Sequence, residues 1–238
     1  MFYYLLKYVL LGPLLRVAFR PKVEGLEHIP STGGALLASN HLAVIDSFVM
    51  PLMVPRRVTF PAKAEYFTEP GFKGRLKKLF FSGAGQVPID RSGGSAAQSA
   101  LDTCVRLLRE GNLVGVYPEG TRSPDGRLYK GKTGIARMAL EAKVPVIPVA
   151  MIGTDKANPI GSKMWRPAKV HIKFGKPLSF DRFDGLAGDR FVERSITDEI
   201  VYALMELSGQ EYVDRYAASV KEGRVAADPT RIPDSKAS

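Results

Sequence analysis

The chain has 238 residues, of which 45% are apolar and 24% are charged; these values exclude disorder along the whole chain and suit one large domain with its own core. Its 34 lysines and arginines against 24 acidic residues give a net charge of +10, which points to an anionic partner: nucleic acid, anionic lipid or a phosphorylated substrate. The single cysteine excludes an internal disulfide and a metal site built on cysteines.

The first twenty residues, MFYYLLKYVLLGPLLRVAFR, form an apolar segment with little charge. Its uncharged run, residues 8–15, lies between Lys7 and Arg16 and falls short of the roughly 20 apolar residues that a membrane-spanning helix needs. Gly12-Pro13 is expected to kink or break a helix there. Two interpretations remain open: an amphipathic membrane-interface segment over residues 1–20, or a terminal helix packed on its own domain.

From there on, short apolar runs typical of strands alternate with amphipathic stretches typical of helices. The expected strands are residues 35–38, 58–60, 86–89, 113–117, 144–152 and 170–174. The expected helices are residues 46–53, 72–81, 95–109, 133–142 and 189–207. This alternation predicts an α/β layered domain over residues 21–208, followed by a polar C-terminal tail, 209–238, that should be loosely ordered.

One candidate site follows the first of these strands, where His41 comes directly after the apolar run and Asp46 stands five positions later. In open α/β sheets ligands bind beyond the carboxyl ends of strands. The two side chains could meet if His41 lay in the turn entering a helix and Asp46 in its first turn, so that the carboxylate fixed the histidine tautomer and left the other nitrogen free to deprotonate an alcohol. The alternative, a histidine satisfied at a strand end, is not excluded by this spacing alone.

A second candidate site follows the strand at 113–117, in the sequence Pro118-Glu-Gly-Thr-Arg-Ser123. Small residues let backbone amides approach an anion, and Arg122 offers a two-pronged grip on a phosphate. A solvated turn is the plainer alternative. If the two strand ends are neighbours, both segments could border one pocket.

These segments resemble signature blocks of the glycerolipid acyltransferases, in particular the 1-acylglycerol-3-phosphate acyltransferases. The matching blocks are Asn40-His41 with Asp46, and residues 118–123. Residues 85–91 (GQVPIDR), the Val-Pro strand at 144–149 and the Lys-Glu segment at 62–65 resemble further blocks of that family, in the same order. The resemblance runs from about residue 23 to about residue 180.

The resemblance implies a glycerol-3-phosphate acyltransferase-like fold, a mixed β-sheet covered by helices, with an amphipathic N-terminal helix. It makes His41 the general base and Asp46 the residue that orients it. The residues expected to bind the acceptor phosphate are Glu119, Gly120, Thr121, Arg122, Arg91 and Lys63. Pro88 departs from the family, which more often has an aromatic residue there, and this affects the expected acceptor preference.

The implied reaction moves a fatty acyl group from acyl-CoA or acyl-carrier protein to 1-acylglycerol-3-phosphate, giving phosphatidic acid. A thioester is already activated, so no cofactor and no metal are expected. The expected location is peripheral or monotopic, at the cytoplasmic face of the cell membrane. The expected partners are an anionic membrane surface and not nucleic acid, in keeping with the basic and aromatic stretch at 72–81. Glycerol-3-phosphate or another lysophospholipid remains an alternative acceptor.

A more distant alternative is a nucleotide- or nucleic-acid-binding protein. Residues 126–133 (GRLYKGKT) match the phosphate-loop pattern formally. That motif needs a strand immediately before it, whereas Ser123-Pro124-Asp125 precedes it here.

Overall fold

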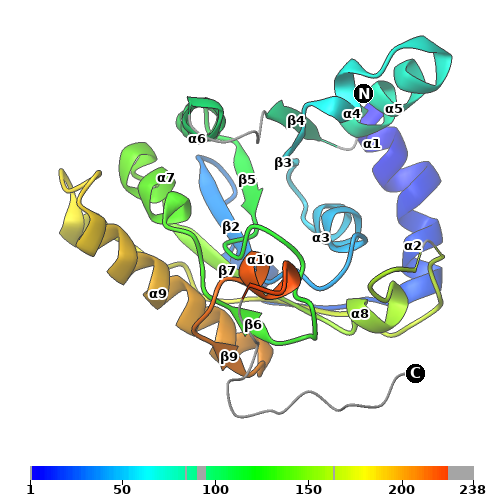
Figure 1. Ribbon diagram of the computed structural model, residues 1–238. Coiled ribbons are helices and arrows are strands. Elements are labelled where there is room, and N and C mark those ends of the chain that lie inside the picture. Colours follow the sequence, from blue (N-terminus) through cyan, green and yellow to red (C-terminus); the bar gives the residue numbers. More distant parts are fainter. Residues whose placement is uncertain (1, 84, 90–94, 163, 225–238) are drawn as a thin grey trace.

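A computed structural model describes residues 2–83, 85–89, 95–162 and 164–224 (Figure 1). Within these residues the centre is a seven-stranded sheet with the order β1-β8-β7-β2-β5-β3-β4. The strands, in that order, are Lys22–Glu24, His171–Phe174, Val146–Ile152, Ala35–Ser39, Leu113–Val116, Val58–Lys63 and Gln86–Ile89. All neighbours run parallel except β7 and β8, so the predicted mixed sheet is confirmed.

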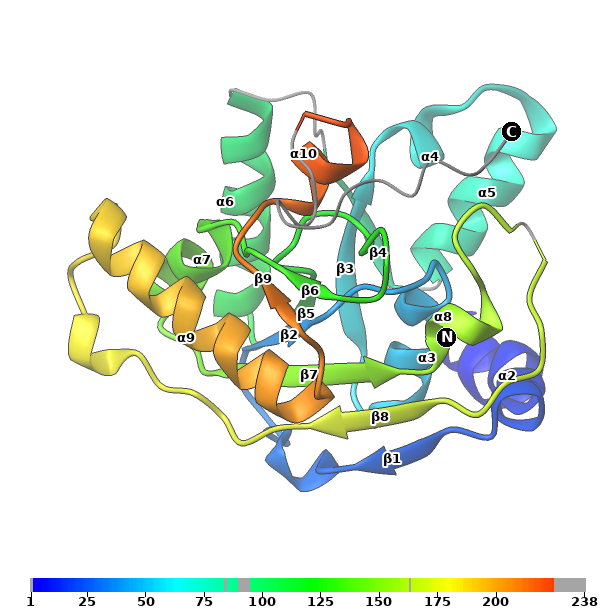
Figure 2. The same ribbon diagram turned by 60° about the horizontal axis from the view of Figure 1, so that its bottom comes forward.

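Helices cover both faces of this sheet, as Figures 1 and 2 show. One face packs against α2 (Leu11–Phe19) and α3 (Asp46–Met53). The other packs against α6 (Ser95–Arg109), α7 (Gly134–Ala142) and α9 (Arg190–Ser208). Every residue of β2 is buried, because successive side chains of a strand point to opposite faces and here both faces are covered.

The parallel strands bring the two candidate sites together. Adjacent strands β2 and β5 pair Ala38 with Val116, so their carboxyl ends lie at the same level of the same sheet edge. The segments that follow, with His41 and Glu119, therefore leave the sheet side by side. The prediction that two polar strand ends meet over one region is confirmed by this register.

The N-terminal segment is a helical rod made of α1 (Phe2–Leu5), a π-helical stretch (Leu6–Leu10) and α2. Of the expected kink or break at Gly12-Pro13, the break is wrong: the helical residues continue from Phe2 to Phe19, and π-helical turns come just before the proline. An ideal Cβ at Gly12 would lie 1.7 Å from the carbonyl oxygen of Lys7, so only glycine fits.

This rod is amphipathic, and its two sides agree with the two interpretations of the segment: one side packs on the domain, and the other is apolar and exposed. Leu15 and Phe19 are buried in the core beside α3. The opposite side exposes the large apolar residues Tyr4, Leu5, Tyr8, Val9, Leu10, Leu14 and Val17. Among the described helices, none combines the length and the hydropathy that crossing a bilayer would require.

The remaining described elements are short, apart from α5. They are the 3₁₀ turns Leu26–His28 and Asp181–Phe183, the helices α4 (Glu65–Thr68), α5 (Gly71–Gly83), α8 (Thr154–Ala157) and α10 (Ala217–Lys221), and the strands β6 (Leu128–Tyr129) and β9 (Tyr212–Val213).

The expectation of a loosely ordered segment after residue 208 is wrong as far as residue 224. Strand β9 pairs with β6, and α10 follows it. Val213 and Ala217 are buried against Tyr129, so a few apolar anchors hold an otherwise polar segment on the domain. Residues 225–238 lie outside the described residues. In Figure 2, α10 lies over the loop that joins β5 to β6.

Candidate active site

Asn40, directly after β2, fixes the path of the chain as it leaves that strand, because its buried side-chain amide is hydrogen-bonded to two neighbouring segments. Its Oδ1 accepts a hydrogen bond from the backbone N–H of Met151 at 2.7 Å, and its Nδ2 donates to the carbonyl oxygen of Met151 at 3.0 Å. Nδ2 also donates to Oε1 of Gln210 at 2.6 Å. The residue before His41 is thereby bound to the end of β7, which sets where His41 leaves the sheet.

His41 and Asp46 meet in the turn that enters α3, the geometry expected from the sequence. Nδ1 of His41 lies 2.9 Å from Oδ2 of Asp46, and that oxygen also accepts the backbone N–H groups of Leu42 and Ala43, each at 2.8 Å. A carboxylate oxygen can only accept, so Nδ1 carries a proton, and in the neutral imidazole the lone pair is then on Nε2. Asp46 is fully buried, whereas the His41 side chain is 15% exposed and accessible to a substrate.

The loop after β5 is hydrogen-bonded to both the backbone N–H and the backbone carbonyl of His41. Oε1 of Glu119 accepts the His41 N–H at 3.1 Å, and the N–H of Ser123 donates to the His41 carbonyl at 2.7 Å. Oε2 of Glu119 accepts the N–H of Tyr129 at 3.0 Å. Burial raises the pKa of Glu119 to about 8, although both backbone donors oppose that change. Glu119 thus ties three segments together from inside the protein.

Tyr117 is a site residue that the sequence did not single out. Its ring stacks on the imidazole of His41, with centroids 3.7 Å apart and planes at 9°. Its hydroxyl lies 2.8 Å from Oγ of Ser47. Its position directly before Pro118, at the end of an expected strand, was the only signal in the sequence.

A groove of about 680 Å³ runs along this end of the sheet. Its apolar lining residues are Val44, Phe48, Phe60, Pro61, Ala62, Phe81, Ala97, Ala100 and Val116. Its polar lining residues, together with Gly120, are His41, Ser47, Gln86, Tyr117, Thr121, Arg122 and Lys132. His41 is in contact with the same open space as the cationic residues, so one bound molecule can reach both.

Gly120 shapes the polar lining of the groove. Its φ of +73° lies in the left-handed region that favours glycine. An ideal Cβ there would lie 3.0 Å from Cε and 3.2 Å from Nζ of Lys132. The missing side chain therefore lets Lys132 pass across the loop and reach the groove beside Arg122.

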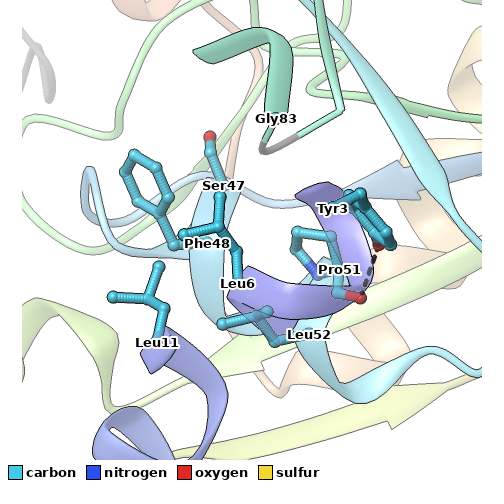
Figure 3. A pocket seen from close by; sticks show the side chains of 8 residues that line it. All are labelled: Tyr3, Leu6, Leu11, Ser47, Phe48, Pro51, Leu52 and Gly83. Carbon is cyan, nitrogen blue, oxygen red and sulfur yellow. Dashed lines mark hydrogen bonds between the residues drawn. The ribbon is translucent and has the colours of Figure 1, made fainter. Parts of the chain in front are cut away.

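The N-terminal rod contacts the C-terminal end of α3, the end opposite to Asp46. A small apolar cavity of about 20 Å³ lies between them, lined by residues of the rod, of α3 and Gly83 (Figure 3). The hydroxyl of Tyr3 donates to the carbonyl of Pro51 at 3.3 Å, and Nζ of Lys7 donates to the carbonyls of Pro51 and Val54. Burial, with Arg16 nearby, lowers the pKa of Lys7 to about 8. The end of α3 that faces away from Asp46 is thus held by the rod.

The expected site residues fall into three groups. His41, Gly120, Thr121 and Arg122 line the groove, and Asp46 is bonded to His41. Glu119 is 1% exposed and does not line the groove. Arg91 and the side chain of Lys63 lie outside the described residues, so their expected roles stay predictions.

Two other features bear on the alternatives. Residues 126–133 contain the short strand β6 and are preceded by a loop, not by a strand, so they lack the arrangement of a phosphate loop. Within the described part of the chain, no three histidine, cysteine or acidic side chains are grouped as metal ligands would be.

Known proteins are similar to this chain in sequence and in fold. The sequence profile of the family described as Acyltransferase matches residues 20–152. A 1-acyl-sn-glycerol-3-phosphate acyltransferase of Limnanthes douglasii is 35% identical over 161 residues, 67% of this chain and 55% of that protein. One of Bacillus subtilis is 30% identical over 159 residues, 66% of this chain and 73% of that protein. The chain thus spans about half the length of the plant relatives that it matches.

A solved structure extends the likeness from the sequence to the fold. The crystal structure of the 1-acyl-sn-glycerophosphate (LPA) acyltransferase PlsC from Thermotoga maritima has a TM-score of 0.60 and 27% sequence identity. The match covers 80% of this chain and 73% of that chain. On the matched profile and this common fold, the chain belongs to the acyltransferase family.

Proposed function

We propose that this protein transfers a fatty acyl group from acyl-CoA or acyl-carrier protein to the free hydroxyl of 1-acylglycerol-3-phosphate, forming phosphatidic acid. One observation carries the proposal: His41, whose Nδ1 is bonded to Asp46, and Arg122 line the same groove. A base and a cation bordering one space suit an acceptor that has both a hydroxyl and a phosphate. The names of the relatives agree with this acceptor.

In the proposed reaction, Nε2 of His41 takes the proton of the acceptor hydroxyl while its oxygen attacks the thioester carbonyl. A C–O bond forms, and the tetrahedral intermediate collapses with cleavage of the C–S bond. The proton on Nε2 then passes to the leaving thiolate, so the histidine returns to its starting state. Asp46 holds Nδ1–H throughout and stabilises the imidazolium. General base catalysis of this kind contributes roughly 10²–10⁴-fold.

The acceptor phosphate is proposed to bind at the cationic lining residues of the groove. Arg122 supplies a planar donor pair, and the backbone of Gly120 and the hydroxyl of Thr121 border the same space. Arg91 and Lys63 are proposed to add positive charge to it. Glu119 acts in this scheme as a positioning residue, since both of its oxygens are occupied by backbone N–H groups.

The acyl chain is proposed to lie along the apolar lining residues of the groove. Phe48, Phe60 and Phe81 border it there. Burying a chain of methylene groups against these rings contributes about 0.8 kcal/mol per CH₂. No cofactor enters the proposed reaction; the acyl thioester is a co-substrate.

The test uses the full chain in detergent, with acyl-CoA as donor and lysophosphatidic acid as acceptor, and follows release of free thiol. His41→Ala is expected to lower the rate by roughly 10²–10⁴-fold. His171→Ala is the matched control, since His171 lies on β8 away from the groove and should keep the rate of the natural chain. Full activity in His41→Ala would remove the proposed base. Glycerol-3-phosphate and lysophosphatidylglycerol, offered as acceptors, measure the preference among phosphate-bearing alcohols.

We also propose that the protein attaches peripherally or monotopically to the cytoplasmic face of the cell membrane. The exposed apolar side of the N-terminal rod supports this, as do Phe72, Leu76 and Leu79, which are exposed on α5 among basic residues. In Figure 1 both elements lie at the same side of the sheet. Apolar side chains among cations are typical of surfaces that bind anionic lipid.

The attachment can be tested by sedimentation with vesicles of phosphatidylglycerol. A variant with Val9, Leu14 and Val17 each replaced by Asp removes exposed apolar contacts without touching the core. It is expected to stay in the supernatant. Phe191→Asp, on α9, removes another exposed apolar residue and should still sediment. If the natural chain, the triple variant and Phe191→Asp all sediment equally, the membrane attachment lies elsewhere in the protein.

A further inference from the structure

A lysine from the C-terminal helix reaches the loop that borders the groove. Lys221 ends α10, and its Nζ donates to Oγ1 of Thr121 at 2.9 Å across 100 positions of the chain. Thr121 and its neighbour Arg122 both line the groove, and Lys132 lines it from the other side of Gly120. Three separate segments therefore bring one cation each to the same loop.

None of these three cations forms an ion pair within the part of the chain that the structure describes. There, no carboxylate lies within ion-pairing distance of Arg122, Lys132 or Lys221, although eleven pairs of a lysine or arginine with a carboxylate occur elsewhere in it. Glu119 is close by, but its oxygens point to backbone amides. Burial lowers the pKa of Lys221 and the positive charge of Arg122 lowers it further, against a smaller opposing effect of Glu119. Unpaired like charges held together in this way are stabilised by an anion.

We infer that Lys221 determines acceptor specificity: with Arg122 and Lys132 it favours a glycerolipid whose phosphate is a monoester over one whose phosphate is a diester. A phosphate monoester carries about −1.5 to −2 charges at neutral pH, and a diester carries one. A cluster of three cations matches the larger charge. This inference rests on the proposed function and deepens it.

The role is one that the family profile does not cover. The profile ends at residue 152, whereas Lys221 lies in the segment held to the domain by β9 and α10. Lys221 can act in two ways, which the experiment must separate. Its charge can attract the phosphate directly, or its hydrogen bond can hold Thr121 in place.

The experiment measures KM and kcat of the full chain in detergent for lysophosphatidic acid, a monoester, and for lysophosphatidylglycerol, a diester. Three variants divide the two roles. Lys221→Arg keeps the charge and a donor, Lys221→Gln keeps a donor without charge, and Lys221→Met keeps neither. Lys176→Met, an exposed lysine beyond β8, is the control for loss of one positive charge from the surface.

If the charge is what matters, Lys221→Gln and Lys221→Met each raise KM for the monoester about tenfold, with kcat within about twofold, and change KM for the diester much less. Lys221→Arg and the control stay near the natural chain. Natural KM in Lys221→Gln with a raised KM in Lys221→Met would assign the effect to the hydrogen bond and overturn the inference, as would equal changes for both acceptors. A raised KM for acyl-CoA instead would assign the lysine to the donor's phosphates, with the same consequence.

The same measurements separate this inference from the proposed function. If the natural chain acylates the acceptors and all Lys221 variants match it, the inference fails and the function stands. If the natural chain acylates neither acceptor, the proposed function fails and the inference fails with it.

Discussion

The imidazole of His41 lies flat against the ring of Tyr117, with centroids 3.7 Å apart and an angle of 9° between the planes. Asp46 holds the same imidazole at its edge, through Nδ1. One face and one edge of the ring are therefore fixed, and Nε2 remains available on the side of the groove. The ring does not need to reorient before it accepts a proton.

The stacking predicts different effects for two substitutions of Tyr117. Tyr117→Phe keeps the ring and loses only the contact with Ser47, so kcat should stay within about threefold. Tyr117→Leu removes the aromatic partner, and such pairs contribute about 0.5–1.5 kcal/mol, so kcat should fall roughly 2- to 12-fold. Steady-state kinetics with saturating acceptor measures both. Burial raises the pKa of the Tyr117 phenol well above its usual value, so we assign Tyr117 the role of an uncharged ring that supports His41. A loss of kcat in Tyr117→Phe that is large and equal to the loss in Tyr117→Leu would contradict this assignment.

Asp46→Asn should separate the negative charge of Asp46 from its hydrogen bonds. The N–H groups of Leu42 and Ala43 donate to Oδ2, so the amide oxygen is expected to take that place and still accept from Nδ1. The variant then lacks only the negative charge that stabilises the imidazolium. A hydrogen bond to a charged group exceeds a neutral one by about 1–2 kcal/mol, so we expect kcat to fall roughly 5- to 30-fold, with little change in KM for the acceptor. Thermal unfolding followed by circular dichroism serves as the control. A natural kcat in a folded Asp46→Asn protein would contradict the role of the Asp46 charge.

Arg122→Ala should weaken acceptor binding more than it slows the chemical step, because the phosphate that it is proposed to bind is present before the reaction begins. A hydrogen bond to a charged group contributes about 1.5–3 kcal/mol, so KM for lysophosphatidic acid should rise roughly 10- to 150-fold. Arg106→Ala, which removes an exposed side chain of α6, is the control for loss of charge. An unchanged KM in Arg122→Ala would contradict the phosphate role.

Glu119 predicts a pH-dependent contribution to stability. Its pKa is raised from 4.5 to about 8 by burial, so the folded chain holds this proton more tightly than the unfolded chain. The contribution is therefore fully present below pH 4.5 and is lost as the pH rises through about 8. Glu119→Gln removes this titration. In the variant, the NH₂ group of the glutamine faces one backbone N–H, and this mismatch should lower the unfolding free energy by about 1–3 kcal/mol.

Urea unfolding of the natural chain and of Glu119→Gln, measured between about pH 5 and 8, checks this expectation. Other groups titrate in both proteins and cancel in the difference. The unfolding free energy of the natural chain should fall more steeply with pH than that of the variant. Parallel curves, or a steeper fall in the variant, would contradict the raised pKa.

Much of the sheet and the pairing of His41 with Asp46 could be predicted from the sequence, because they depend on residues that are close together in the chain. A continuous apolar run predicted β2, and helical periodicity predicted α6. His41 and Asp46 are five positions apart, so one turn suffices to join them. The family blocks added the phosphate loop at 118–123.

What the sequence alone determined is thus the local part: which segments form strands and helices, which family blocks are present and where a base and a phosphate loop stand in the chain. Only the tertiary structure decided that Tyr117 covers the face of His41, that Glu119 turns inward and that Lys221 reaches Thr121. The physical reason is that stacking, burial and contacts across 100 positions depend on how the layers pack. No spacing or periodicity along the chain encodes them.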